Sequence, residues 1–148
     1  MAKFVYRMQN ILDIKYKMES QAKSHYANMR IRLTTEQEKL EHLLADKKRL
    51  EDYYRELAGG RLNVRDLLDG RRAIDYQKEL IKEQLVQLKV AEKNFEMARV
   101  RLNEAMKERK TQEKLKERAF SEFMAELSDQ EKKEIDELVS YRYGSTGE

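Results

Sequence analysis

The stretch Ala58-Gly59-Gly60-Arg61-Leu62-Asn63 decides the fold, because it is the one strong interruption of an otherwise helical pattern. Two adjacent glycines raise the entropic cost of a helix and can adopt the positive φ values of a helix C-cap. Asn63 is a favourable N-cap for a following helix, with Asp66 in its first turn. The stretch therefore predicts a turn between two helices.

The composition favours long helices over a compact globule. The 148 residues include no proline and no cysteine, and charged residues make up 40% of the chain. The apolar residues are spread thinly, without the long runs that build a thick core. We expect one coiled-coil hairpin over residues 1–148, with helix one at about 3–57, a turn at about 58–63, helix two at about 64–141 and a frayed tail at 142–148.

The first arm carries a heptad repeat when Leu40 is placed at position a. Positions a and d form the seam of a coiled coil, and twelve of these sixteen residues are apolar. The a series is Val5, Leu12, Glu19, Tyr26, Leu33, Leu40, Lys47 and Tyr54. The d series is Met8, Lys15, Ala22, Met29, Glu36, Leu43, Leu50 and Leu57.

The second arm repeats a large residue every seven positions, with alanines three positions after the later ones. The large residues are Ile74, Ile81, Leu88, Phe95 and Leu102, and the alanines are Ala91, Ala98 and Ala105. Such alternation lets two helices approach closely, and a short glycine turn makes them antiparallel. The expected fold class is all-α, a long two-helix antiparallel coiled-coil hairpin.

Arg109 interrupts the second series, and Gly70 should weaken the first turns of the second helix. Apolar spacing resumes out of phase, which predicts a local change in supercoil winding. The residues of the resumed series are Leu115, Ala119, Phe123 and Leu127.

Nothing in the sequence indicates catalysis, a cofactor or a metal. His25 and His42 lie seventeen residues apart on one predicted helix, and no phosphate-binding or nucleophile motif occurs. No stretch reaches the ~20 apolar residues of a membrane span, and the N-terminus lacks the features of a secretory signal. We therefore expect a cytoplasmic binding protein that is not an enzyme.

A nucleic-acid-binding coiled coil is an alternative, because the net charge is +3. The basic clusters lie at 47–49, 71–72 and 107–118, but acidic residues stand beside each of them. A surface that follows a nucleic-acid backbone should be more one-sided, so solvated coiled-coil surface is the better interpretation.

Aromatic residues gather at both ends of the predicted hairpin. Tyr53 and Tyr76 fall off the seam near the turn, where they either pack loosely or form a partner patch. A second group at the termini comprises Phe4, Tyr6, Ile11, Tyr141 and Tyr143. Two clusters at opposite ends predict two partners, one at each end.

Three segments resemble the flagellar FliJ family. They are F-V-Y-R-M-Q-N-I-L-D-I-K at 4–15, E-K-L-K-E-R at 113–118 and E-I-D-E-L-V-S-Y-R-Y at 134–143. The resemblance implies a type III flagellar export protein, an antiparallel coiled coil similar to the central stalk of rotary ATPases. It implies a cytoplasmic protein, peripheral at the inner face of the cell membrane at the flagellar base.

The resemblance also implies partners. The paired termini would enter the hexameric export ATPase (FliI type), and the hinge-side half would contact the cytoplasmic domain of the export-gate membrane protein (FlhA type). Some members escort export chaperones. No nucleic acid or small-molecule ligand is implied. A generic coiled-coil spacer and a stalk homologue from an injectisome or a rotary ATPase are the alternatives.

The resemblance assigns two groups of site residues. The ATPase-ring-binding tip comprises Phe4, Tyr6, Arg7, Ile11, Tyr141, Arg142 and Tyr143. The export-gate-binding tip comprises Leu50, Tyr53, Tyr54, Ile74, Tyr76, Gln77 and Leu80. The aromatic element that family members carry early in helix two aligns with either Tyr76-Gln77 or Ala73-Ile74.

Overall fold

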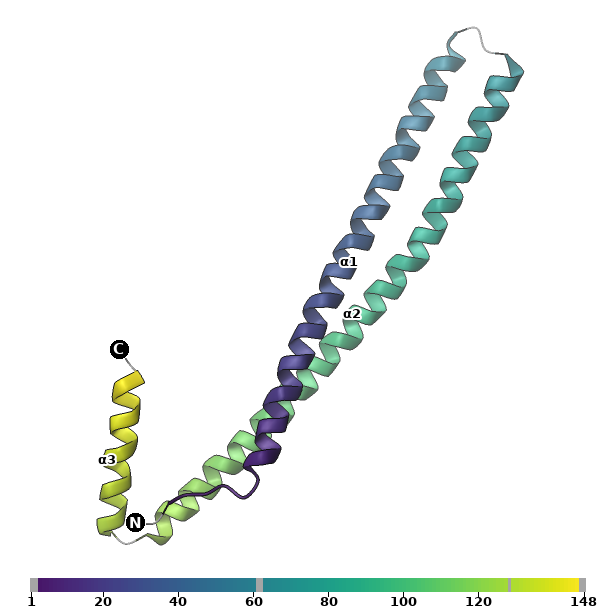
Figure 1. The fold of residues 1–148 in the computed structure, drawn as a ribbon. Helices are drawn as coiled ribbons and strands as arrows, with labels where there is room; N and C mark the ends of the chain where they lie inside the picture. The colour runs from purple at the N-terminus through teal and green to yellow at the C-terminus, as the bar shows by residue number, and fades with distance from the viewer. Residues whose placement is uncertain (1–2, 61–62, 128, 147–148) are drawn as a thin grey trace. The chain divides into compact units, whose positions relative to one another are not determined.

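A computed structural model describes residues 3–60, 63–127 and 129–146. Within these ranges the chain forms three helices and no strand: α1 (Gln9–Ala58), α2 (Val64–Glu126) and α3 (Asp129–Thr146) (Figure 1). The helices α1 and α2 are long and pack against each other. The predicted all-α class with two paired long helices is therefore confirmed.

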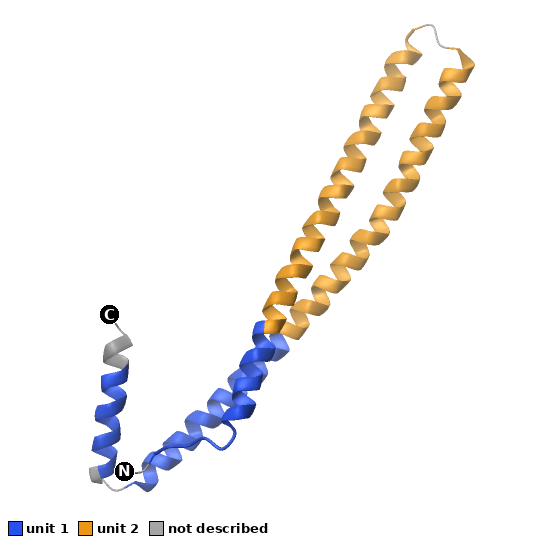
Figure 2. Ribbon diagram, in the orientation of Figure 1, with its two compact units in different colours: residues 1–20, 103–148 blue, residues 21–102 orange. Residues whose placement is uncertain are grey.

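The chain divides into two compact units (Figure 2). The terminal unit comprises residues 1–20 and 103–148, and the hinge unit comprises residues 21–102. The beginning of α1 thus packs in the same unit as the end of α2, as a hairpin requires. That the whole chain acts as one domain stays a prediction.

The order of contacts in the hinge unit shows that α1 and α2 run antiparallel. As the residue number rises along α1, the number of the contacting residue on α2 falls. The successive pairs are Tyr26 with Phe95, Glu36 with Gln84, Leu43 with Gln77, and Tyr54 with Gly70.

The predicted heptad register of the first arm holds from Leu12 to Leu57, where every a and d residue is buried or half-buried. Ala91, Ala98 and Ala105 of α2 are all buried, as the alternating pattern predicted. Small side chains at these positions let the two helix backbones approach closely, so the large residues of the facing helix fill the space beside them.

The start of the first helix differs from the prediction. The helix α1 begins at Gln9, and residues 3–6 are not helical. Phe4 instead packs against Phe120 and Phe123, with ring centroids 5.2 and 5.4 Å away. Because the heptad rule applies only to helix, the seam positions assigned to Val5 and Met8 are wrong, and Val5 is 79% exposed.

The series predicted after Arg109 holds for three of its four residues, because Ala119, Phe123 and Leu127 are half-buried. Every seventh residue from Arg109 stays half-buried, at Lys116 and at Phe123, whereas Leu115 is 42% exposed. The helix therefore keeps one contact face through the interruption. Polar residues occupy that face for two turns. The heptad repeat of α2 therefore continues there without an apolar pattern in the sequence.

The prediction of one second helix over 64–141 is wrong as well, because α2 ends at Glu126 and α3 begins at Asp129. The sequence Ser-Asp-Gln-Glu at 128–131 has the S-x-x-E spacing of a capping box, a signal for a new helix. The tail predicted to fray from residue 142 is helical to Thr146, since one glycine weakens a helix without ending it. Residues 147–148 lie outside the described residues.

The turn between the long helices is confirmed in position but differs in geometry. The amides of Gly59 and Gly60 donate to the carbonyls of Glu56 and Leu57 at 3.2 and 3.1 Å, which tightens the last turn of α1. No described glycine has a positive φ, so the expected left-handed cap is absent from this part of the chain. Residues 61–62 lie outside the described residues.

The predicted cap of α2 is present. The Asp66 amide donates to Asn63 Oδ1 at 2.8 Å, so the Asn63 side chain satisfies one amide of the first turn.

Gly70 has a packing role that its helix propensity conceals. The residue is buried, and a Cβ added to it would overlap the Tyr54 ring. Because glycine has no Cβ, the Tyr54 ring has room to pack in the seam near the turn. The low helix propensity of glycine is the energetic cost of this packing.

Replacing Gly70 by alanine should lower the free energy of unfolding by about 1–3 kcal/mol, because the methyl group displaces the Tyr54 ring. Denaturant unfolding followed by circular dichroism measures the change. Gly59→Ala is the matched control, since a Cβ there makes only ordinary contact with the Glu56 carbonyl. Stability that rises in Gly70→Ala, as alanine propensity alone would give, would contradict the packing role.

Candidate partner-binding surfaces

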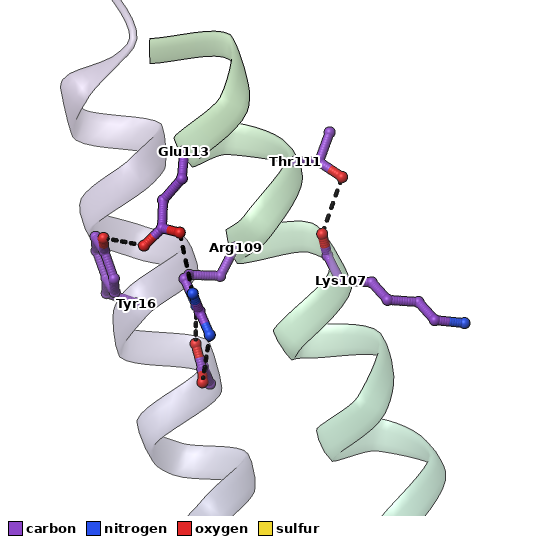
Figure 3. Close-up of polar contacts among 6 residues, drawn as sticks. Tyr16, Lys107, Arg109, Thr111 and Glu113 are labelled. Atoms are coloured by element: carbon purple, nitrogen blue, oxygen red, sulfur yellow. Dashed lines mark hydrogen bonds and ion pairs between the residues drawn. The ribbon is translucent and has the colours of Figure 1, made fainter. Parts of the chain in front are cut away.

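A polar cluster interrupts the apolar seam in the terminal unit (Figure 3). Arg109 donates through Nε to Glu19 Oε2 at 2.6 Å and through Nη2 to Glu19 Oε1 at 3.3 Å. Its Nη1 donates to Glu113 Oε2 at 3.0 Å, and the Tyr16 hydroxyl donates to the other oxygen of Glu113. One guanidinium thus joins carboxylates from both helices.

The charges in this cluster stabilise one another. The Glu19 and Arg109 side chains are only 6% and 19% exposed. The hydrogen bonds from Tyr16 and then Arg109 lower the pKa of the Glu113 carboxyl, and the hydrogen bond that the Tyr16 phenol donates to Glu113 raises the pKa of that phenol. The bond to Glu19 raises the pKa of the Arg109 guanidinium. Glu113 therefore stays ionised, and Arg109 and Tyr16 stay protonated, near neutral pH.

The cluster is a structural device, because its side chains satisfy each other within the seam. A buried pair of this kind penalises any register that separates its two members. The other polar seam residues of α1 are also paired, Lys15 with Glu108, Glu36 with Gln84 and Lys47 with Glu51.

The N-terminal residues assigned to the ring-binding tip divide between packed and exposed positions. Phe4 is half-buried against its two phenylalanine partners. Tyr6 is half-buried, and its enclosed hydroxyl has no hydrogen-bond partner among the described residues. Arg7 and Ile11 are exposed. Phe4 therefore anchors the N-terminal segment, which leaves Arg7 and Ile11 as the accessible members.

The C-terminal residues assigned to this tip lie on α3, within the same unit. Tyr141 and Arg142 are exposed. The Tyr143 side chain lies outside the described part of the structure. Arg142 also borders an open cleft of about 820 Å³ whose lining includes Phe4, Leu12, Phe120 and Val139. The described residues that were predicted at the two chain ends thus belong to one unit.

An apolar patch in the terminal unit extends beyond the predicted residues. Ile11, Ile14 and Met18 are all exposed and follow the i, i+3, i+7 spacing of one helix face. Tyr16 and Glu113, both at position e, bond across one edge of the pair, so the g positions Ile11 and Leu115 flank the opposite edge. We call Ile11, Ile14, Met18 and Leu115 the terminal patch. The spacing of its α1 members was readable from the sequence, although only Ile11 was predicted.

The residues assigned to the gate-binding tip also divide into two groups. Tyr53 and Tyr76 are 57% and 66% exposed, and we call this pair the hinge patch. Gln77 is buried, and its Nε2 donates to the Leu43 carbonyl at 2.9 Å, so it serves the seam. The half-buried residues of the group are Leu50, Tyr54, Ile74 and Leu80.

No group of three or more His, Asp or Glu side chains in the described ranges is placed to hold a metal ion. None of the described helices is long and apolar enough to cross a membrane.

Replacing Arg109 by alanine should lower the melting temperature more than Arg99→Ala does. The first change leaves the buried Glu19 carboxylate without its guanidinium, whereas Arg99 pairs with Glu96 on the solvated surface. Thermal unfolding followed by circular dichroism compares the two. The double variant Glu19→Leu with Arg109→Leu should regain most of the loss; equal effects of the two single changes would contradict a special role for the cluster.

Comparison with known proteins assigns the chain to a family. A family model described as "Flagellar FliJ protein" matches residues 4–148, nearly the whole chain. Searches of curated proteins and of solved structures returned no match. The family consists of non-catalytic components of the flagellar export apparatus at the flagellar base. On the extent of this match, the chain belongs to the flagellar FliJ family.

Proposed function

We propose that this protein is a stalk and escort of the flagellar export apparatus that binds two partners through its two units. The terminal unit would bind the hexameric export ATPase of the FliI type, and the hinge unit would bind the cytoplasmic domain of the FlhA-type export gate. Export chaperones are further candidate partners. The observation that carries the proposal is the presence of a separate exposed apolar or aromatic patch on each unit.

The terminal unit has the features of a ring-binding end. Both chain ends belong to it, and the terminal patch exposes four large apolar side chains. Exposed apolar groups of this kind usually mark contact with another protein. The basic residues Arg7 and Arg142 are also exposed in this unit, so the end offers charge as well as apolar area. The identity of the partner rests on the family.

We expect binding of this protein to promote assembly of the ATPase ring and its turnover of ATP. A two-helix stalk has no rotational symmetry that matches six subunits. Its binding would therefore favour one arrangement of the subunits at a time, and that differential affinity would promote assembly and ATP turnover. The protein itself needs no catalytic group for this effect.

The hinge patch has the chemistry of a second interface. Tyrosine is a favoured interface anchor, since it offers a large rigid area with a polar end. Tyr53 lies at the g edge of α1, and Tyr76 lies at position c of α2, next to that edge. Both rings therefore lie on one side of the hairpin, where a single partner could contact them together. This arrangement favours Tyr76, rather than Ala73, as the aromatic element of helix two.

Replacing Ile14 and Met18 by aspartate should reduce stimulation of the purified export ATPase at least tenfold at limiting protein. Both side chains are exposed, so the helices should stay folded while apolar contact with the ring is lost. ATP hydrolysis is measured over a titration of each protein. Tyr53→Ala with Tyr76→Ala is the control and should stimulate normally. Unchanged stimulation by the aspartate variant would argue against the terminal patch.

Replacing Tyr53 and Tyr76 by alanine should weaken binding to the purified gate domain about tenfold or more, because two anchor rings are removed. Calorimetry or surface plasmon resonance measures the dissociation constant. Ile14→Asp with Met18→Asp should bind the gate normally. If neither partner binds the unmodified protein, the generic spacer becomes the better explanation.

A further inference from the structure

Two neighbouring threonines on the exposed face of α1 make additional hydrogen bonds to the helix backbone in the hinge unit. The Thr34 hydroxyl donates to the Arg30 carbonyl at 3.1 Å, and the Thr35 hydroxyl donates to the Ile31 carbonyl at 2.9 Å. Bonds of this kind compete with the helical amides, slightly destabilise a helix and often bend it. Threonine also has a low helix propensity because it is β-branched. The outer face of α1 is therefore easier to deform at this turn.

A polar layer replaces an apolar one in the seam directly after the threonines. Glu36 occupies a d position, and its side chain is only 21% exposed. Gln84 of α2 donates through Nε2 to the Glu36 carbonyl at 2.9 Å and to Glu36 Oε2 at 2.6 Å. The next d layer toward the turn repeats the arrangement, since Gln77 donates to the Leu43 carbonyl. These directed bonds fix α1 to α2 between the threonines and the turn.

The contacts of α1 before the threonines are of a different kind. Met29 is buried, and the Tyr26 ring packs against Phe95 with ring centroids 5.1 Å apart. Apolar packing has no preferred direction, and a methionine side chain adapts its shape to its surroundings. These contacts therefore allow small movements of α1 that the directed bonds of Gln84 resist.

An open groove of about 280 Å³ lies beside this part of the helix pair. Its lining consists of Met29, Arg32 and Glu36 from α1 and Gln87, Val90, Ala91 and Asn94 from α2. Gln77, Gln84 and Ala91 share one heptad position, so the side chain at that position becomes shorter just beyond the polar layer. The groove leaves space into which α1 can bend.

We propose that α1 bends at residues 30–36 toward this groove, so that the hinge unit contains a bending point. A helix curves when the hydrogen bonds on its solvent-facing side lengthen, and that side of α1 carries both threonines here. The groove provides the space that the bend needs on the side of α2. The bonds from Gln84 to Glu36 hold the two helices together beside the bending point, so the movement is a bend and not a separation of the pair.

The role of the bending point rests on the proposed function. If the terminal unit and the hinge patch hold two partners, a bend within the hinge unit would let the hinge patch move while the terminal unit stays bound. The bend itself is a property of the free protein and is measured without either partner. A failed partner assay and a failed bending test are therefore separate results.

Hydrogen exchange followed by NMR tests the bending point in the free protein. Residues 34–36 should have protection factors about tenfold lower than residues 27–29 and 41–43, which occupy the same heptad positions one repeat away on either side. Thr34→Ala with Thr35→Ala should remove most of this difference. Thr111→Ala is the control, because it removes the same kind of bond from α2 in the terminal unit and should leave the difference unchanged.

A distance measurement tests the direction of the bend. The chain has no cysteine, so spin labels can be attached at Arg32→Cys with Asn94→Cys, a pair that lines the groove. His25→Cys with Arg101→Cys is the matched pair one heptad further along both helices. Double electron–electron resonance should give a broader distance distribution for the groove pair, and the two threonine changes should narrow it. Equal protection factors at the three matched segments, or equal widths for the two label pairs, would overturn the proposal.

Discussion

The close approach of two antiparallel helices along one narrow seam is the constraint on which the rest of this structure depends. Ala91 and Ala98 lie buried at the contact, and a helix pair has no other interior in which to bury a side chain. The charged seam residues of α1 accordingly all have a polar partner. Arg109 with Glu19 and Gln84 with Glu36 show how polar residues are accommodated without separating the helices.

Much of the fold could be predicted because it follows local rules. The heptads of the first arm from Leu12 onward, the buried alanines of the second and the Asn63 cap depend on spacing and on near neighbours, and all three hold. The start of α1 depends instead on Phe4 meeting rings that lie more than a hundred residues away in the sequence. The periodicity of apolar residues cannot predict contacts between residues so far apart in the sequence.

The same distinction separates what could and could not be predicted about the candidate surfaces. Tyrosines off the seam can be identified from the heptad register, and Tyr53 and Tyr76 are exposed. Gln77 stands beside Tyr76, yet it is bound to a carbonyl of the other helix. The sequence of α2 alone did not indicate that its contact face continues through Arg109, because the residue that pairs with the Arg109 charge is Glu19 of α1. An accessible surface on a hairpin is therefore defined by what the facing helix leaves uncovered.

The attachment of Phe4 has a consequence for the first residues of the chain. Residues 3–6 lack the hydrogen bonds of a helix, and two aromatic contacts hold them to the end of α2. A protein that offered its own aromatic pocket to Phe4 would compete directly with Phe120 and Phe123. A partner that bound Phe4 would thus expose the rings of Phe120 and Phe123. Binding of residues 3–6 by a partner is therefore coupled to the exposure of new apolar surface on α2.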